Sequence, residues 1–168
     1  MSINRRSLFA GAAVSAAGFG VAKFAPWGAQ AQGTAKVFEV TKTEAEWRKL
    51  LSPQAFEVLR QHGTERAGTS PLAREKRAGV FHCAGCDLPL FSSTTKYDSG
   101  TGWPSFWKPL DNAIGTSIDK SFFSTRTEVH CRRCGGHLGH VFEDGPKPTG
   151  LRYCMNGVAM GFKPAAAS

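Results

Sequence analysis

The hydrophobic residues near the start of the predicted folded region recur at the spacing of an α-helix. Over residues 43–61 the apolar positions return every three or four residues, which predicts amphipathic helices. Thr43 with Glu46 three places later forms a capping box, a sequence signature of a helix start. Ser52 followed by Pro53 restarts the pattern as a second cap and first turn. This region therefore predicts two consecutive helices.

From Gly79 onward the pattern changes to short apolar runs separated by glycine, proline, aspartate and asparagine. Runs of this length between turn residues are typical of β-strands. The candidate strands are VFHC, PLF, GTSI, SFFSTRTEVHC, HVFE, LRYC and VAMGF. No internal repeat occurs beyond two Cys-x-x-Cys motifs, so we expect a single domain. The predicted fold is mainly β and mostly antiparallel, with the two amino-terminal helices laid on a small β core.

The composition is that of an ordinary soluble domain, with 41% hydrophobic and 20% charged residues among 168. The formal net charge is +8, but three of these charges lie in the first 31 residues, where no acidic residue offsets them. No run of basic residues interleaved with aromatics occurs in the remainder. We therefore expect no nucleic-acid partner, and a zinc-ribbon nucleic-acid binder is a minor alternative.

The amino terminus has the features of an export signal. Arg5 and Arg6 precede a weakly apolar run over residues 10–22, which is shorter than the roughly 20 residues that a membrane-spanning helix needs. Lys23 follows, and residues 29–31 fit the small-x-small cleavage pattern. The segment resembles a bacterial twin-arginine signal and predicts export to the periplasm, with the membrane met only during export. An uncleaved, disordered basic tail is the alternative.

Four of the five cysteines form two Cys-x-x-Cys pairs, Cys83 with Cys86 and Cys131 with Cys134, with 44 residues between the pairs. Four thiolates in this arrangement are typical of a closed, tetrahedral structural zinc site. Each pair brings two sulfurs together locally, and the distant partner would tie separate strands into one domain. We expect one structural Zn²⁺ per chain. Two redox-active dithiols or two disulfides are the alternative.

The fifth cysteine, Cys154, lies in the run GLRYCMN. Arg152 and Asn156 stand two residues away on either side, so in a strand all three side chains point to one face. The charge of Arg152 would favour the thiolate, and Asn156 can hydrogen-bond a substrate or orient a histidine. These neighbours favour a nucleophile over the alternative of a buried thiol that acts as a small hydrophobe.

Two histidines, His137 and His140, follow the second cysteine pair in the run HLGH. A tetrahedral site with four sulfurs leaves no position for them. We interpret them as active-site groups, because a neutral imidazole can donate or accept a proton near neutral pH. Zinc ligation and a purely structural role are the two alternatives for this pair.

Several motifs, taken together, resemble the peptide-methionine (R)-S-oxide reductases of the MsrB type. They extend from about residue 40 to residue 163, and their order and spacing are more specific than any one of them. The motifs are HGTERAGTSPL, CAGCDLPLF, KYDSGTGWPSF, CRRCGGHLGHVFEDGPKPTG and LRYCMN. The resemblance implies a β-tent-like fold of two small antiparallel sheets. It also implies a structural zinc remote from the chemistry, and a site on one sheet face.

The resemblance implies roles for individual residues as well. The catalytic set that it implies is Cys154, His137, His140, Arg152 and Asn156. The substrate-binding set is Trp103, Phe142 and Asp144. Trp103 and Phe142 would form the aromatic wall that holds the methyl group of the sulfoxide. Trp103 would select one epimer by admitting that methyl group on only one side of the sulfur.

These residues support reduction of methionine-R-sulfoxide, protein-bound or free, to methionine. The Cys154 thiolate would attack the sulfoxide sulfur while His137 or His140 supplies protons to the oxygen. Cys154 would then become a sulfenic acid, which thiols can reverse. A zinc-held ligand-binding module and a thiol redox sensor without turnover are the alternatives.

Two positions depart from the family pattern. Many members carry a second cysteine at the position of Thr101, which attacks the oxidised catalytic cysteine. Because no spare thiol remains in this chain, we expect an external reductant, either a thioredoxin-like protein or a small thiol. Gly157 stands where the resemblance leads us to expect a serine.

The chain is therefore expected to comprise four segments. Residues 1–31 are the signal peptide, residues 32–39 a flexible linker, residues 40–163 the MsrB-type catalytic domain, and residues 164–168 a disordered tail.

Overall fold

The computed structural model describes residues 37–121 and 124–166. The predicted signal peptide and most of the predicted linker lie outside these residues. Among the residues described, no helix is both long enough and apolar enough to cross a lipid bilayer.

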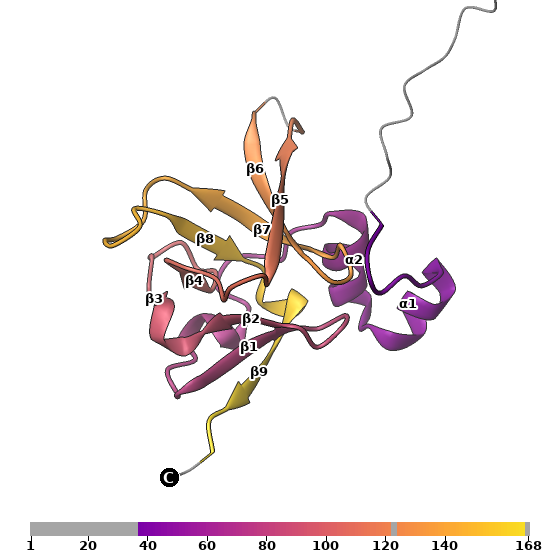
Figure 1. Ribbon diagram of the computed structural model, residues 1–168, viewed down its shortest axis with the longest axis horizontal. Coiled ribbons are helices and arrows are strands. Elements are labelled where there is room, and N and C mark those ends of the chain that lie inside the picture. The colour runs from indigo at the N-terminus through magenta and orange to yellow at the C-terminus, as the bar shows by residue number, and fades with distance from the viewer. Residues whose placement is uncertain (1–36, 122–123, 167–168) are drawn as a thin grey trace, which may run out of the picture. The chain divides into compact units, whose positions relative to one another are not determined.

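Both predicted helices are present, α1 over Glu44–Leu50 and α2 over Pro53–Gln61 (Figure 1). The Thr43 hydroxyl accepts a hydrogen bond from the Glu46 N–H, and the Glu46 carboxylate accepts one of 2.8 Å from the Thr43 N–H. These two bonds complete the predicted capping box. Ser52 caps α2 by accepting a hydrogen bond from its first turn. The buried face of α2 packs against strand β7 and a short helix, η3.

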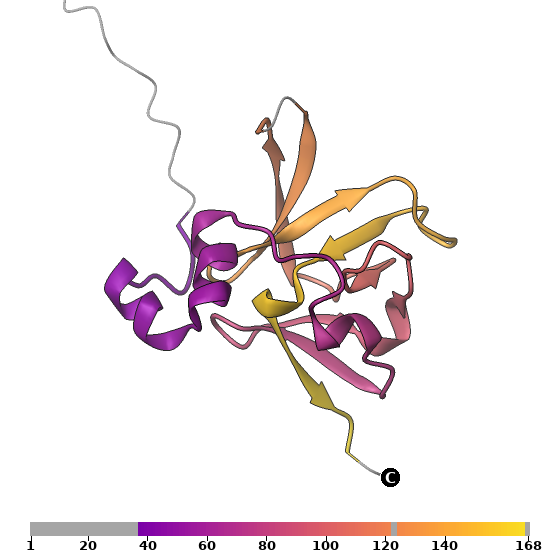
Figure 2. The ribbon, with the colours of Figure 1, turned by 180° about the vertical axis from the view of Figure 1, so that it is seen from behind.

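The strands form two antiparallel sheets, as the sequence predicted (Figures 1 and 2). The small sheet has the order β2-β1-β9, with β1 at Gly79–Cys83, β2 at Pro89–Ser92 and β9 at Met160–Pro164. The large sheet has the order β3-β4-β8-β7-β6-β5. Its strands are β3 Lys96–Tyr97, β4 Ser105–Phe106, β5 Ile114–Asp119, β6 Arg126–Cys131, β7 His137–Phe142 and β8 Arg152–Met155. In the part of the chain that the structure describes, three 3₁₀ helices lie between strands or before them: η1 Pro71–Arg74, η2 Ser93–Thr95 and η3 Gly157–Ala159.

Aromatic side chains fill the space between the two sheets. The ring of Phe106, from the large sheet, stacks on Phe91 with centroids 4.3 Å apart and meets Phe81 edge-on at 4.9 Å. Phe81 and Phe91 belong to the small sheet, and all three side chains are fully buried. Buried aromatic pairs contribute about 0.5–1.5 kcal/mol beyond their area. This cluster therefore fixes how the two sheets pack.

The large sheet has one apolar face and one polar face. Val129, Leu138 and Met155 are fully buried on the side of the core. On the opposite face, Glu128 of β6 stands across from His140 of β7, and His140 stands across from Cys154 of β8. Side chains alternate between faces along a strand, so this register places the polar residues of three strands on one surface.

Two predicted strands begin later in the chain than the sequence runs suggested. The run that starts at Ser121 is regular strand from Arg126 onward. The run from Val158 becomes strand only at Met160, after one turn of 3₁₀ helix.

The structure explains why glycine replaces the expected serine at position 157. A Cβ atom built on Gly157 would lie 2.6 Å from the Cβ of Ser70 and would overlap its hydroxyl. The Gly157 N–H donates to the Glu65 carboxylate, so the backbone has little freedom to move away. Ser70 itself caps η1 by accepting a hydrogen bond from Leu72. A side chain at 157 and a side chain at 70 therefore exclude each other.

We predict that Gly157→Ser lowers the free energy of unfolding by about 1–3 kcal/mol, the usual range for overpacking. Urea denaturation followed by tryptophan fluorescence measures this loss. Adding Ser70→Gly should restore most of the stability, since it removes the clashing atoms and costs only a few tenths of a kcal/mol as a cap. Additive effects of the two changes would contradict the contact.

Candidate active site and metal centre

Cys154 lies half-buried in the middle of the polar face of the large sheet. It is paired with Ser105 of β4 on one side and His140 of β7 on the other. Its side chain lines a cavity of about 120 Å³. Drug-sized pockets run to about 300–1,000 Å³, so this cavity suits a small end group rather than a large ligand. The other residues that line it are Thr64, Trp103, Arg126, Gly139, His140, Phe142 and Asn156.

The apolar part of the cavity wall consists of Trp103 and Phe142. The Trp103 indole N–H donates a 3.1 Å hydrogen bond to the Glu65 carbonyl, which fixes the orientation of the ring. The Arg152 guanidinium lies 4.4 Å from the centroid of the Phe142 ring, at cation–π distance. Both rings are therefore held in place by polar partners outside the cavity.

His140 lines the cavity, and its Nε2 lies 2.8 Å from a carboxylate oxygen of Asp119. Burial lowers the pKa of His140 below its usual value, and the hydrogen bond to Asp119 opposes this shift without cancelling it. Hydrogen bonds from Ser121, then from His140 and Arg126, keep the pKa of Asp119 well below its usual range. A neutral His140 beside an ionised carboxylate carries its proton on Nε2. Nδ1 is then the ring nitrogen able to accept a proton.

His137 lies behind His140, with ring centroids 5.3 Å apart, and is almost fully buried. It is three residues from His140, a spacing that puts side chains on opposite faces of a regular strand. The pairing of β6 with β7 shifts register by one residue next to Val129, and this bulge turns His137 to the polar face. His137 Nδ1 lies 2.8 Å from Glu128 Oε1.

Glu128 is the centre of a buried polar cluster beneath the cavity. Its Oε1 also lies 3.1 Å from Nδ1 of His62, whose side chain is 66% exposed, and its other oxygen accepts a hydrogen bond from Ser117. The hydrogen bond from His137 is the main reason that the pKa of Glu128 falls to about 2. An ionised Glu128 accepts hydrogen bonds only, so it selects the Nδ1–H form of His137.

Arg152 and Asp144 lie beside the cavity without lining it. The Arg152 guanidinium makes two 2.8 Å hydrogen bonds to the Asp144 carboxylate, in the bidentate arrangement. The hydrogen bonds to Asp144 raise the pKa of Arg152. The charges of Cys154 and Tyr97 raise it further by smaller amounts. Arg152 therefore acts on Cys154 through its field and on Phe142 by direct contact. Asp144 is exposed and serves as the partner of Arg152.

Asn156 lines the cavity and also fastens two loops together. Its amide oxygen accepts a 2.9 Å hydrogen bond from the Glu65 N–H, and its amide nitrogen donates a 3.1 Å bond to the Leu138 carbonyl. Glu65 in turn binds the backbone of η3 through its carboxylate. Asn156 thus holds the segment that positions Trp103.

The structure brings five of the eight predicted site residues to one cavity: Trp103, His140, Phe142, Cys154 and Asn156. His137, Arg152 and Asp144 stand behind or beside it, and the catalytic or binding roles of all eight stay predictions. Sequence reasoning missed the residues that support the histidines: Glu128, Asp119, Arg126 and His62. A signal existed for Glu128 and Arg126, two charged residues within one predicted strand.

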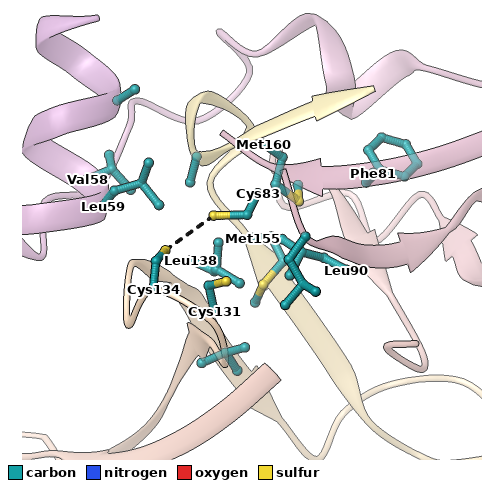
Figure 3. Close-up of a cluster of buried hydrophobic side chains, with 14 of the residues drawn as sticks. Val58, Leu59, Phe81, Cys83, Leu90, Cys131, Cys134, Leu138, Met155 and Met160 are labelled. Carbon is teal, nitrogen blue, oxygen red and sulfur yellow. Dashed lines mark hydrogen bonds between the residues drawn. The ribbon is translucent and has the colours of Figure 1, made fainter. Parts of the chain in front are cut away.

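The four remaining cysteines come together at one end of the core. Figure 3 shows three of them, Cys83, Cys131 and Cys134. Both Cys-x-x-Cys turns are built alike. The N–H of Asp87 donates to the Cys83 carbonyl, and the N–H of Gly135 donates to the Cys131 carbonyl, each at 2.9 Å. Asp87 and Gly135 both have positive φ, with values of 59° and 67°. Glycine and aspartate tolerate this left-handed conformation better than most residues.

The geometry of the sulfurs fits a tetrahedral metal site. Cys83 Sγ lies 3.7 Å from Cys134 Sγ, and Cys86 Sγ lies 3.5 Å from Cys131 Sγ. A zinc ion with four sulfurs at about 2.3 Å requires sulfurs roughly 3.8 Å apart. A disulfide would need about 2.05 Å, so the four cysteines are free thiols here. The cluster could hold a metal ion.

The fold and the site define a domain whose cysteines divide between a metal cluster and a small cavity lined by histidine and aromatic residues. A model of the SelR domain matches residues 51–164. The peptide methionine sulfoxide reductase MsrB of Pseudomonas putida is 55% identical over 127 residues, which cover 75% of this chain and 96% of that protein. The protein of the same name from Methanosarcina barkeri is 54% identical over 125 residues, covering 74% and 88%.

The MsrB of Agrobacterium fabrum is 50% identical over 127 residues, which cover 75% of this chain and 94% of that protein. The chain therefore belongs to the MsrB family of peptide methionine sulfoxide reductases, which are oxidoreductases. This confirms the resemblance that the motifs carried.

We predict that Glu128→Gln lowers the free energy of unfolding at neutral pH by about 1.5–3 kcal/mol, the usual worth of a hydrogen bond to a charged group. The folded-state pKa of about 2 lies below the ordinary value of 4.5. The contribution of Glu128 is therefore complete above about pH 4.5 and is lost as the pH falls toward about 2.

Urea titrations of the wild type and the variant at a series of pH values test this, with Glu143→Gln at an exposed position of the same sequence region as the control. The stability difference for Glu128→Gln should shrink over the acid window. A difference that stays constant with pH would contradict the role of its charge.

Proposed function

We propose that this protein reduces the R epimer of methionine sulfoxide to methionine, with the Cys154 thiolate as the nucleophile. The observation that carries the proposal is the division of the cysteines. Four sulfurs are gathered in one cluster, and the fifth, Cys154, lines a small cavity with His140 and an aromatic wall. Membership of the MsrB family supports the same reaction.

The reaction that we propose needs only one proton, and Cys154 can supply it. The thiol would pass its proton to Nδ1 of neutral His140, and the resulting thiolate would attack the sulfoxide sulfur. The protonated His140 would return that proton to the sulfoxide oxygen, which gives a hydroxyl still bonded to the substrate sulfur. The hydroxyl would then bond to Cys154 Sγ as both bonds of the substrate sulfur, to this oxygen and to Cys154 Sγ, break. The substrate sulfur regains its electron pair and leaves as methionine, and Cys154 carries the oxygen as a sulfenic acid. His137, which is buried behind His140, would orient it rather than meet the substrate.

The aromatic wall supports selection between the two sulfoxide epimers. Trp103 and Phe142 form the apolar side of the cavity, whereas His140 and Arg126 form a polar side. A sulfoxide has a methyl group and an oxygen on the same sulfur. With the sulfur facing Cys154, only one epimer can place its methyl group on the apolar side and its oxygen on the polar side.

Regeneration of Cys154 would come from an external thiol. Thr101 Oγ1 lies 3.8 Å from Cys154 Sγ. Thr101 occupies the position at which the resemblance implies a second cysteine in many family members. The other four cysteines belong to the cluster, so the chain has no further thiol to offer. A small thiol or a thioredoxin-like dithiol could attack the sulfenic acid. Protein-bound methionine sulfoxide is the proposed substrate, with the free amino acid as a second one.

The metal that we propose for the four-sulfur cluster is zinc, with one ion per chain held by Cys83, Cys86, Cys131 and Cys134. Hydrogen bonding to Cys131 and to the other sulfurs, together with burial, raises the pKa of Cys83. A divalent cation would offset the repulsion among four buried thiolates. Its role would be structural, since all four ligand positions are filled by the chain.

Export to the periplasm is also part of the proposal, and its support is the sequence alone. Arg5, Arg6 and the cleavage pattern that ends at Ala31 lie outside the described residues. A twin-arginine pathway carries folded proteins, which suits a domain that needs its metal before it crosses the membrane.

We predict that the wild type, given racemic methionine sulfoxide and dithiothreitol, consumes the R epimer alone, and that Cys154→Ser folds normally but shows no turnover. Chiral chromatography of the remaining sulfoxide measures both. Consumption of both epimers, or activity in the variant, would refute the assignment. Binding without turnover in the wild type would favour a ligand-binding module or a redox sensor.

The same experiment without reductant tests the fate of Cys154. About one methionine per chain should form, and the product should react with sulfenic-acid probes because no second thiol is available. An intramolecular disulfide formed after one turnover, with metal still bound, would overturn this step.

We predict that Cys86→Ser releases the zinc and destabilises the whole domain, because metal binding is part of the folding free energy. Metal analysis of the purified wild type should give one zinc per chain. The matched control is Cys154→Ser, which should keep its zinc. Freshly purified, active wild-type protein without zinc would show the proposal to be wrong.

A further inference from the structure

Three hydroxyl side chains lie in a row behind Cys154. Its Sγ is 3.8 Å from Thr101 Oγ1, which is 2.8 Å from Ser99 Oγ, which is in turn 2.7 Å from Ser105 Oγ. Ser105 Oγ then donates a 3.1 Å hydrogen bond to the Trp103 carbonyl. We call Thr101, Ser99 and Ser105 the hydroxyl chain. All three come from the loop that leads into β4 or from its first residue.

Counting hydrogens fixes the direction of every bond in the hydroxyl chain. A hydroxyl has one hydrogen to donate and two lone pairs that accept. Ser105 donates its hydrogen to the Trp103 carbonyl, so it must accept from Ser99. Ser99 has then used its hydrogen and must accept from Thr101. Thr101 has also used its hydrogen, and its remaining contact, with Cys154, can only be an accepted S–H bond. This arrangement of donors therefore requires Cys154 to be a neutral thiol.

A thiolate at Cys154 has no hydrogen to donate, and the hydroxyl chain must then change. Suppose that Thr101 turned its hydrogen to the sulfur and the other hydroxyls did not move. Thr101 Oγ1 and Ser99 Oγ would then lie 2.8 Å apart with no hydrogen between them. Ser99 must therefore turn toward Thr101, and Ser105 toward Ser99, because each separation is a hydrogen-bond distance. The second arrangement runs in the opposite direction. It loses only the bond from Ser105 to the Trp103 carbonyl.

We propose that Thr101 is a positioning residue for the Cys154 thiolate: when the thiol loses its proton, the hydroxyl chain reverses as a unit and Thr101 donates a hydrogen bond to the sulfur. A hydrogen bond to an ion is roughly twice as strong as one between neutral groups. The bond gained at the sulfur therefore outweighs the neutral bond lost at the Trp103 carbonyl. Ser99 opposes the thiolate, because it couples Thr101 to Ser105, and Ser105 must give up its bond to the Trp103 carbonyl when the chain reverses.

This inference gives position 101 a chemical requirement, namely a hydroxyl, beyond the absence of a second thiol. It concerns the same cysteine as the proposed function, yet its test needs no substrate and no turnover. The reactivity of Cys154 toward an alkylating agent reports its thiolate fraction directly. A negative alkylation result would contradict the role of Thr101 but not the proposed reductase activity. A lack of reductase activity would contradict the proposed function but not the alkylation result.

The experiment compares the rate at which iodoacetamide modifies Cys154 at neutral pH in folded, metal-loaded wild type, Thr101→Val, Thr101→Ser and Ser99→Ala. Peptide mass spectrometry separates Cys154 from the cluster cysteines. Thr101→Val, which has nearly the same shape, should react about tenfold more slowly, the effect of losing one hydrogen bond to an ion. Thr101→Ser keeps the hydroxyl and should react at the wild-type rate.

Ser99→Ala should change the rate in the opposite direction and raise it about fivefold, the worth of one neutral hydrogen bond. With Ser99 removed, Thr101 can donate to the sulfur while Ser105 keeps its bond to the Trp103 carbonyl. The pH of half-maximal rate should move upward for Thr101→Val and downward for Ser99→Ala. A loosened loop would instead speed or slow alkylation in both variants alike.

The other charged and titratable groups around Cys154 stay the same in all four proteins. They are His140 from β7, Arg126 from β6, Tyr97 from β3 and Arg152 from β8. Their influence therefore cancels in the comparison. Equal rates for the wild type and Thr101→Val, or changes of the same sign for Thr101→Val and Ser99→Ala, would overturn the proposal.

Discussion

The four cysteine sulfurs lie at the junction of two turns, one between β1 and β2 of the small sheet and one between β6 and β7 of the large sheet, where they could hold a metal ion. Strand β7 begins three residues after Cys134 and carries both histidines. The junction therefore sets where His137 and His140 enter the polar face. The stacked rings of Phe91 and Phe106 hold the same two sheets together from inside the core. The four-sulfur cluster and Cys154 are kept apart, because the cluster lies with the core and Cys154 lies on the polar face.

On the polar face, two ionised carboxylates orient the two histidines. Asp119 holds the outer imidazole, His140, and Glu128 holds the inner one, His137. Glu128 comes from β6, the strand beside β7, and Asp119 comes from β5, one strand further along the sheet. Each carboxylate is also bound by a hydroxyl, and its hydrogen bonds together keep its pKa below the usual range. Such supporting groups decide which nitrogen of an imidazole carries its proton. The cavity thus holds His140, fixed by Asp119, as the cross-strand partner of Cys154.

The two departures from the family pattern have local physical explanations. Gly157 leaves room for the side chain of Ser70, which caps η1. Thr101 places a hydroxyl next to Cys154, at the position where the family resemblance implies a second cysteine in many members. This hydroxyl continues into a chain that ends on a backbone carbonyl. The first departure concerns packing, and the second concerns the electrostatics of the nucleophile. Neither disturbs the strand register that pairs Cys154 with His140.

The sequence by itself determined the two helices, the mainly antiparallel β fold, the four-plus-one division of the cysteines and the family. These are carried by local patterns: caps, apolar period, turn residues and motif spacing. Only the tertiary structure decided which residues surround Cys154. A one-residue bulge turns His137 to the polar face, and strand pairing brings Glu128, Asp119 and Arg126 in from segments that no local pattern connects to the motifs. The direction of the hydroxyl chain is likewise a matter of distances across a loop, because a hydroxyl reveals its partner only when the backbone has placed both.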